Sequence, residues 1–426
     1  MAQIQYVVEG RCALSGSIEP AGNKNAALPI IAASLLTEHR VALENVPRIR
    51  DTETLVELVR SVGARAEWIG ANTLEIEARS IRASSLDARL CARIRASILL
   101  AAPLLARCGE ISLPPPGGDV IGRRRVDTHF LALRQLGATV VAKEHFAFRT
   151  RGLRGADVFL DEPSVTGTEN ALMAAVAAEG TTVLRNAASE PHVQDLCALL
   201  NAMGARINGI GTNCLVIDGV DGLHGAEFTI GPDYLEVGSF IGLAAVTRSA
   251  LRIADCRPHE HGMTRIMLNR LGVDWRVDGN DIVVPDDQQL AVIDDQGHAV
   301  PKIDDAPWPG FPADLISIAT VIATQARGAI LIHEKLFESR LFFVDRLINM
   351  GARIILCDPH RAVVIGPSPL YGQALISPDI RAGMALLIAA LCAEGESVID
   401  NVHQIDRGYE HIEERLVALG ADVRRS

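Results

Sequence analysis

The most regular feature of the chain is an alternation between two kinds of helical pattern. One kind is rich in Ala, Leu and Ile and apolar on every side, which predicts a buried helix. The other kind has a polar face, which predicts a helix at the surface. Buried helices are expected at residues 25–36, 96–106, 168–178, 236–246, 314–324 and 381–392. The pattern therefore predicts six buried helices, each followed by a surface helix.

A short motif closes each surface helix: an apolar residue, a glycine and a small residue, followed by β-forming residues. The glycine occupies the position of a helix C-cap, and the residues after it predict a strand. The six glycines lie about 70 residues apart, which is typical of an internal repeat. They are Gly63, Gly137, Gly204, Gly272, Gly351 and Gly420. The sequence thus predicts six β-α-β-α-β-β units, most simply arranged as an α/β protein of two lobes with a junction near Gly231-Pro232.

Composition narrows the class of protein. The chain has 426 residues, enough for two domains, and a net charge of −11, which argues against a general nucleic-acid binder. The eight cysteines form no C-x-x-C pair, so neither a zinc site nor a disulfide framework is expected. The amino terminus lacks the pattern of a signal peptide, and every apolar run is too short to span a bilayer. These features predict a cytoplasmic protein without a membrane segment.

Three cations stand where the macrodipole disfavours them, at the starts of buried helices: Lys24, Arg95 and Arg381. Each placement costs a few tenths to about 1 kcal/mol, and an anion bound between the lobes would resolve the conflict. Equivalent positions before the surface helices hold three more cations, namely Arg124, Arg340 and Arg407. We expect the six to converge on a ligand with several anionic groups. The alternative interpretation is a solvated surface.

Three other stretches carry candidate chemistry. Residues 114–125 combine three prolines, two glycines and Asp119 ahead of three arginines, which indicates either a working loop or a surface turn. Asp314 is a lone carboxylate at a helix start, where it can accept a proton, cap the helix, or do both. The small polar run Ser164-Val165-Thr166-Gly167 offers backbone N–H groups for a diphosphate, although any capped helix looks similar.

Several motifs resemble the enolpyruvyl transferases, in particular the branch that acts on a nucleotide sugar. The resemblance extends from near residue 10 to the end of the chain. The matching motifs are 23–29 (Asn-Lys-Asn-Ala-Ala-Leu-Pro), 95–97 (Arg-Ala-Ser), 116–119 (Pro-Gly-Gly-Asp), 311–314 (Phe-Pro-Ala-Asp) and 405–410 (Ile-Asp-Arg-Gly-Tyr-Glu). The resemblance implies a two-lobed inside-out α/β barrel. Its first lobe would span residues 23–231 and carry the active-site loop 114–125, and its second lobe would span 1–22 and 232–426.

The resemblance also implies a reaction. The enolpyruvyl group of phosphoenolpyruvate would pass to the 3-hydroxyl of UDP-N-acetylglucosamine through a tetrahedral intermediate, with release of phosphate, as the committed step of peptidoglycan synthesis. No metal, no cofactor and no obligatory protein partner is implied.

The resemblance assigns a role to each candidate residue. Lys24, Arg124 and Arg407 would bind the phosphate of phosphoenolpyruvate, and Arg340 with Arg381 its carboxylate. Asp314 would take the proton of the sugar hydroxyl, and Asp119 would supply a proton as the loop acid. The residues implied for the nucleotide sugar are Asn25, Arg95, Arg124, His129, Ser164, Val165, Thr166, Gly167 and Asp314.

The chain departs from the family pattern at three positions. Many members have cysteine where this chain has Asp119, so we expect resistance to fosfomycin, which alkylates that cysteine. Arg125 and Glu162 stand where relatives have proline and lysine, which leaves open a paralogue acting on another uridine nucleotide. A further alternative is an inactive nucleotide-sugar sensor, although such a sensor would not need the cations assigned to phosphoenolpyruvate. The loop and the 311–314 motif disfavour the shikimate-specific branch.

Overall fold

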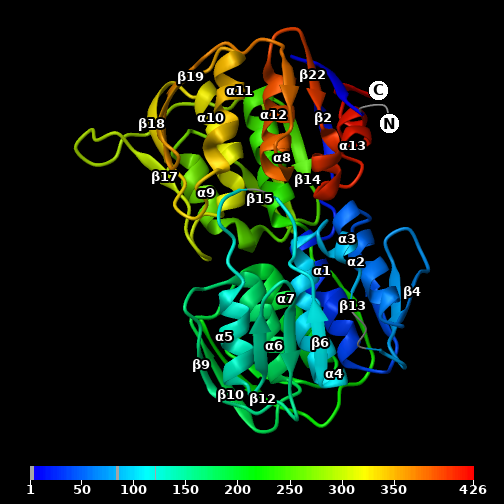
Figure 1. Cartoon of the computed structure of the whole chain (residues 1–426). Coiled ribbons are helices and arrows are strands. Elements are labelled where there is room, and N and C mark those ends of the chain that lie inside the picture. The colour runs from blue at the N-terminus through cyan, green and yellow to red at the C-terminus, as the bar shows by residue number, and fades with distance from the viewer. Residues whose placement is uncertain (1–3, 83–85, 120) are drawn as a thin grey trace. The chain divides into compact units, whose positions relative to one another are not determined.

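The computed structural model describes residues 4–82, 86–119 and 121–426, and these residues form two compact units. The first unit comprises Gly22–Asp119 and Arg124–Gly231. The second unit comprises residues 4–21, 121–123 and 232–426, so that it includes both described ends of the chain (Figure 1). Residues 121–123, within the loop predicted at 114–125, group with the second unit.

Apolar helices form the centre of the first unit, because their sequences leave no polar face for water. Helix α6 packs against α1 and α4 within one hydrophobic core. The helices of this unit are α1 (Lys24–Ala33), η1 (Ser34–Leu36), α2 (Arg50–Ser61), α3 (Ala88–Cys91), η2 (Arg95–Leu100), α4 (Ala101–Cys108), α5 (Asp127–Gln135), α6 (Val165–Ala175) and α7 (Pro191–Ala202).

Three sheets belong to the first unit, with strand orders β13-β3-β5-β4, β6-β8-β7 and β11-β12-β10-β9. The β3–β13 and β9–β10 pairs are parallel and the other pairs are antiparallel. The strands are β3 (Val41–Glu44), β4 (Arg65–Trp68), β5 (Leu74–Glu77), β6 (Glu110–Leu113), β7 (Thr139–Ala142), β8 (Phe146–Arg149), β9 (Asp157–Phe159), β10 (Thr181–Arg185), β11 (Arg206–Asn208), β12 (Cys214–Asp218) and β13 (Ala226–Thr229).

The second unit repeats this plan around helices α8, α10 and α12, which pack pairwise in a core of their own and lie side by side in Figure 1. Shorter helices cover them. The helices of this unit are α8 (Tyr234–Thr247), η3 (Pro258–His261), α9 (Gly262–Asn269), η4 (Ala313–Leu315), α10 (Ile316–Gln325), η5 (Arg340–Phe343), α11 (Val344–Asn349), α12 (Ile380–Cys392), η6 (Val402–Arg407) and α13 (Ile412–Ala418).

Its three sheets have the orders β21-β22-β1-β23, β15-β16-β14-β2 and β17-β18-β20-β19. Strand β1 pairs antiparallel with both β22 and β23, with Tyr6 opposite Ile399 and Arg425, which joins the two ends of the chain. The strands are β1 (Tyr6–Glu9), β2 (Ser15–Ile18), β14 (Ala250–Ile253), β15 (Arg276–Asp278), β16 (Asp281–Val284), β17 (Lys302–Asp304), β18 (Gly328–His333), β19 (Arg353–Asp358), β20 (Arg361–Gly366), β21 (Ala374–Ile376), β22 (Glu396–Asp400) and β23 (Asp422–Arg425).

The six glycines of the repeat all adopt the left-handed conformation expected after a helix, with φ between 80° and 110°. A strand follows each of them within a few residues, as predicted. The predicted α/β fold class of two lobes is confirmed, because each unit contains three sheets arranged with buried helices. No helix within the described residues is long and apolar enough to cross a membrane.

Two helix starts differ from the prediction because capping side chains lie further upstream. Helix α6 begins at Val165 rather than at residue 168, since the Ser164 hydroxyl accepts a hydrogen bond from the Gly167 N–H. Helix α8 begins at Tyr234 rather than at residue 236, since the Asp233 carboxylate accepts from the next turn. The segments at Arg95 and Asp314 begin as 3₁₀ helices, η2 and η4, before the α-helix continues.

Candidate active site

Lys24 opens helix α1 and is almost completely buried, with 9% of its side chain exposed. Asn23 caps this helix, and its side chain accepts from the N–H groups of Asn25 and Ala26. The Lys24 ammonium lies 2.7 Å from the carboxylate of Asp51, which is itself 7% exposed in the first turn of α2. A carboxylate at this distance offsets the unfavourable placement of a cation at a helix amino terminus.

Arg95 and Arg124 lie against the backbone of the loop that carries Asp119. A Cβ atom added to Gly118 would stand 3.0 Å from the Arg95 Cβ and 3.4 Å from the Arg124 Nη1. Gly117 is also held close, since its N–H donates to the Cys91 carbonyl at 3.1 Å. Burial, followed by repulsion from Arg124, lowers the pKa of Arg95 to about 10. The structure therefore places Asp119 immediately after a glycine that has no room for a side chain beside Arg95 and Arg124.

His129 and Thr166 meet where helix α5 packs against helix α6. The His129 Nε2 atom lies 3.0 Å from the Thr166 hydroxyl, and Nδ1 lies 2.8 Å from the side-chain nitrogen of Asn170. His129 is fully buried, and burial followed by repulsion from Arg95 lowers its pKa to about 3. Of the predicted residues of helix α6, the structure thus joins Thr166 directly to His129.

Asp314 is the centre of the corresponding site in the second unit. One of its carboxylate oxygens accepts from Arg340 Nη2 at 2.6 Å, and the other accepts from Arg381 Nε at 3.0 Å. Both guanidiniums are buried, while 26% of the Asp314 side chain is exposed. The structure therefore brings the predicted base and the two predicted carboxylate-binding arginines together, with the carboxylate open to solvent.

The electrostatic environment of these arginines is set by burial and by the acidic groups around them. Burial acts to lower the pKa of Arg340, but Asp314 and Glu334 together raise it above its ordinary value. Burial acts likewise on Arg381, whose pKa is raised by Tyr409 and Asp314; the Arg381 guanidinium lies 5.4 Å from the Tyr409 ring centroid. Both guanidiniums are therefore charged at physiological pH.

Glu334 lies behind Arg340 and was not anticipated from the sequence. Its side chain is fully buried, and burial, followed by repulsion from Asp305, raises its pKa to about 9. Its Oε1 accepts from the Phe337 N–H at 3.1 Å, and its Oε2 lies 3.9 Å from the Arg340 Nε. Glu334 is therefore a neutral acid beside a cation at physiological pH.

Arg407 ends helix η6, where its Nη1 donates to the Gln404 side chain at 2.9 Å. Arg125 and Glu162 are two of the three positions at which the chain departs from the family pattern. In the structure they share one network, since Arg125 contacts Asp127 at 2.9 Å, Asp161 at 2.8 Å and Glu162 at 4.0 Å. The two side chains that differ from the family pattern, Arg125 and Glu162, therefore attract each other as an ion pair.

Three residues of the candidate site were not predicted from the sequence, namely Asp51, Asn170 and Glu334. An acidic residue in the first turn of an amphipathic helix, as at Asp51, looks like ordinary helix capping. Asn170 did carry a signal, because it is an amide within a helix that was expected to be buried. Glu334 carries no sequence signal, since only the fold shows that it is buried.

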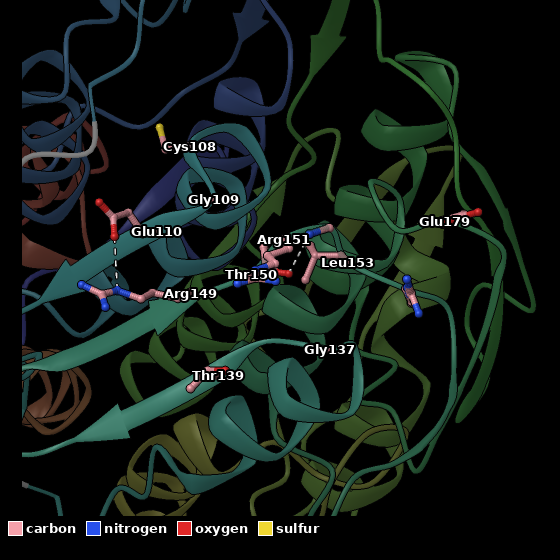
Figure 2. A pocket seen from close by; sticks show the side chains of 12 residues that line it. Cys108, Gly109, Glu110, Gly137, Thr139, Arg149, Thr150, Arg151, Leu153 and Glu179 are labelled. Atoms are coloured by element: carbon pink, nitrogen blue, oxygen red, sulfur yellow. Dashed lines mark hydrogen bonds and ion pairs between the residues drawn. The ribbon is translucent and has the colours of Figure 1, made fainter.

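A cavity of about 790 Å³ lies elsewhere in the first unit, where the ends of α4 and α5 meet the loop that follows β8 (Figure 2). Arg149, Arg151 and Arg154 line it together with Glu110 and Glu179. Arg149 pairs with Glu110 at 3.2 Å, as the dashed line in Figure 2 shows. None of the predicted site residues lines this cavity.

Comparisons with known proteins identify relatives over the whole chain. The model of the family described as EPSP synthase (3-phosphoshikimate 1-carboxyvinyltransferase) matches residues 8–416. A protein of Bradyrhizobium diazoefficiens named UDP-N-acetylglucosamine 1-carboxyvinyltransferase is 67% identical over 100% of this chain and 99% of its own length. A protein of the same name from Treponema denticola is 56% identical over 98% of both chains.

Solved structures of enolpyruvyl transferases have the same fold as this chain. The enolpyruvyl transferase NikO from Streptomyces tendae superposes with a TM-score of 0.87 at 27% identity, covering 100% of this chain and 99% of that one. EPSP synthase from Acinetobacter baumannii, at 17% identity, shares the fold with a TM-score of 0.76 and full coverage of both chains. The matched family model, the relatives and the shared fold together show that the chain is a transferase and belongs to the enolpyruvyl transferase family.

Proposed function

We propose that the chain transfers the enolpyruvyl group of phosphoenolpyruvate to the 3-hydroxyl of UDP-N-acetylglucosamine, with release of phosphate, in peptidoglycan synthesis. The observation that carries the proposal is the arrangement of Asp314 between Arg340 and Arg381. A partly exposed carboxylate suits the removal of a hydroxyl proton, and two buried guanidiniums suit the binding of a substrate carboxylate. The 67% identical relative bears the name of this activity.

The reaction divides into an addition and an elimination. In the addition, the sugar oxygen forms a bond to the central carbon of phosphoenolpyruvate, its proton passes to Asp314, and the methylene carbon receives a proton from Asp119. In the elimination, the methyl group returns a proton to Asp119, the carbon–oxygen bond to phosphate breaks, the double bond returns, and the departing phosphate takes the proton held by Asp314. Lys24, Arg124 and Arg407 are assigned to the departing phosphate, whose charge they would stabilise. Asn25, Arg95 and the 164–167 segment are assigned to the nucleotide sugar.

We also propose that the reaction takes place in the cytoplasm. All eight cysteines are free thiols, which is typical of proteins kept in a reducing compartment.

Phosphate release tests the proposed function. Phosphoenolpyruvate is supplied with UDP-N-acetylglucosamine and, in parallel, with UDP-glucose, UMP or shikimate 3-phosphate. We expect turnover with the N-acetyl sugar nucleotide alone, and its loss in Asp119→Ala. Faster turnover with another acceptor would contradict the proposed substrate, and binding without phosphate release would contradict the proposed reaction.

Fosfomycin tests the role of the loop separately. A carboxylate at position 119 lacks the thiolate that the epoxide alkylates, so the wild-type protein should resist inactivation, whereas Asp119→Cys should be inactivated in a time-dependent manner. Mass spectrometry of the loop peptide distinguishes the two, since only the cysteine variant should carry an adduct. An adduct on the wild-type loop would refute this prediction.

A further inference from the structure

The side-chain amide of Asn170 bridges two backbone groups of the neighbouring helix. One of them, the Ile98 carbonyl, also accepts from the Ala101 N–H. At the junction of η2 and α4, the Ile98 carbonyl and the Ala102 N–H are four residues apart, the spacing of an α-helical hydrogen bond. The Asn170 amide stands between them: its Oδ1 accepts from the Ala102 N–H at 3.1 Å, and its Nδ2 donates to the Ile98 carbonyl at 2.9 Å. Asn170 is fully buried, so these contacts are shielded from water.

These two contacts determine which way the amide points. A backbone N–H can only donate and a backbone carbonyl can only accept, so exchanging the oxygen and nitrogen of Asn170 would place like groups against each other at both positions. The second N–H of Asn170 Nδ2 then points at His129 Nδ1, 2.8 Å away. This ring nitrogen must therefore be the acceptor.

The direction of the hydrogen bond between His129 and Thr166 follows from the proton position on the His129 ring. Burial, with a further contribution from Arg95, lowers the pKa of His129 to about 3, so the ring is neutral at physiological pH and carries one proton. With Nδ1 accepting, that proton is on Nε2 and is donated to the Thr166 hydroxyl oxygen at 3.0 Å. Thr166 is thus an acceptor toward His129 and retains its own proton for another partner.

Within the described residues, Thr166 makes no other hydrogen bond through its side chain. Threonines within helices often donate to the carbonyl four residues earlier, but Thr166 lies in the first turn of α6, where that carbonyl precedes the helix. Its side chain is partly exposed. The hydroxyl proton therefore has no acceptor among the described residues, and it lies beside the amino terminus of an 11-residue helix, where anions are favoured.

We propose that Asn170 and His129 are positioning residues that aim the hydroxyl proton of Thr166 at an anionic oxygen of the nucleotide-sugar substrate. This inference rests on the proposed function for the identity of the ligand. It refines the assignment of His129, which would act through Thr166 rather than by touching the substrate. Asn170 would fix the proton position on the His129 ring, a role that its burial alone does not indicate.

A binding cycle with UDP-N-acetylglucosamine, measured by calorimetry without phosphoenolpyruvate, tests the proposal. Thr166→Val removes the hydroxyl at nearly constant shape and should weaken binding about tenfold, whereas Thr166→Ser keeps the hydroxyl and should change binding less than about threefold. Asn170→Asp should reverse the chain, because its carboxylate accepts a proton from Nδ1 and leaves Nε2 to accept from Thr166. It should therefore weaken binding as much as Thr166→Val.

The double variant separates positioning from packing. If Asn170 acts through Thr166, adding Asn170→Asp to Thr166→Val should weaken binding no further. An equal loss in both backgrounds would show a structural effect and overturn the proposal.

The ¹⁵N resonances of the His129 ring test the same chain in the unaltered protein, so that a variant that fails to fold does not end the test. A proton on Nε2 is expected, and a proton on Nδ1 would overturn the proposal. Failure of the proposed function is distinguishable, since it would appear as absent phosphate release with the Nε2 proton still in place.

Discussion

The two units hold their candidate residues by different means. In the second unit, the negative charge of Asp314 is balanced by two buried guanidiniums. The groups that would bind substrate therefore already bind each other. In the first unit, the chain Asn170–His129–Thr166 is neutral, and each member has its direction set by the previous one. Charged groups supply strong interactions but compete among themselves, whereas a neutral chain presents one proton without competition.

The largest expected effect concerns the charged centre. Asp314→Asn removes the carboxylate that would accept the hydroxyl proton, while the amide keeps nearly the same shape. We expect phosphate release to fall about 10²- to 10⁴-fold, the usual contribution of a general base. Asp304→Asn is the matched control, because that carboxylate contacts Lys302 and Lys335 at 2.9 Å rather than Arg340 or Arg381. Equal rates in the two variants would show that Asp314 is not the base.

The second test concerns the buried ion pair of the first unit. It asks whether the stability of the fold depends on the charge that faces Lys24. Asp51→Asn removes the carboxylate 2.7 Å from the buried ammonium, so the free energy of unfolding should fall by about 3 kcal/mol. Urea denaturation measures this change. Glu53→Gln is the control, since Glu53 faces Arg48 at 3.6 Å at the surface and should change stability by less than about 1 kcal/mol. Similar values for both variants would mean that the buried pair contributes little.

The third test uses pH, to which Glu334 in the second unit and His129 in the first unit should respond in opposite directions. Glu334 has a pKa of about 9 in the folded protein and 4.5 as its ordinary value, so between these values only the folded state holds the proton. This group therefore stabilises the fold increasingly as pH falls from 9 toward 4.5. His129 has a folded pKa of about 3 and an ordinary value of 6.5, so it destabilises the fold as pH falls through that range.

Glu334→Gln isolates the pH-dependent contribution of Glu334 to stability. Between pH 8 and pH 6 the free energy of unfolding of the wild-type protein should rise relative to that of the variant by up to about 3 kcal/mol, since each pH unit contributes about 1.4 kcal/mol. Denaturant titrations at several pH values measure the difference, with the exposed Glu396→Gln as control. Parallel pH curves for wild type and Glu334→Gln would show that Glu334 is ionised in the folded state.

The smallest effect is expected at the surface of the first unit. Arg125→Ala removes the contacts to Asp127 and Asp161, which are partly exposed, so stability should fall by about 0.2 to 1 kcal/mol and less at high salt. Affinity for UDP-N-acetylglucosamine should change less than about threefold. A tenfold loss of affinity would show that Arg125 contacts the nucleotide and that this departure from the family pattern alters substrate preference.

The periodicity of the chain was sufficient to predict the architecture. Apolar helices at regular spacing must be buried, and glycine is the residue best able to adopt the left-handed conformation after a helix, so six repeats and their α/β class follow from local rules. Lys24, Arg340 and Arg381 were also recognisable, because a cation or a motif stood at an unusual position. The helix starts at Val165 and Tyr234 were missed by two or three residues, since caps further upstream satisfy the first turn.

The direction of each interaction depended on the tertiary structure. Asp51 and Asn170 lie 27 and 41 residues from Lys24 and His129, and their partners are chosen by how helices pack rather than by spacing along the chain. The pKa of Glu334 likewise follows from complete burial beside Asp305, which no local pattern encodes. Local sequence specifies which elements form, because backbone conformation and helix amphipathicity are local properties. Charge pairing, proton position and pKa depend on distances that exist only after the elements have packed.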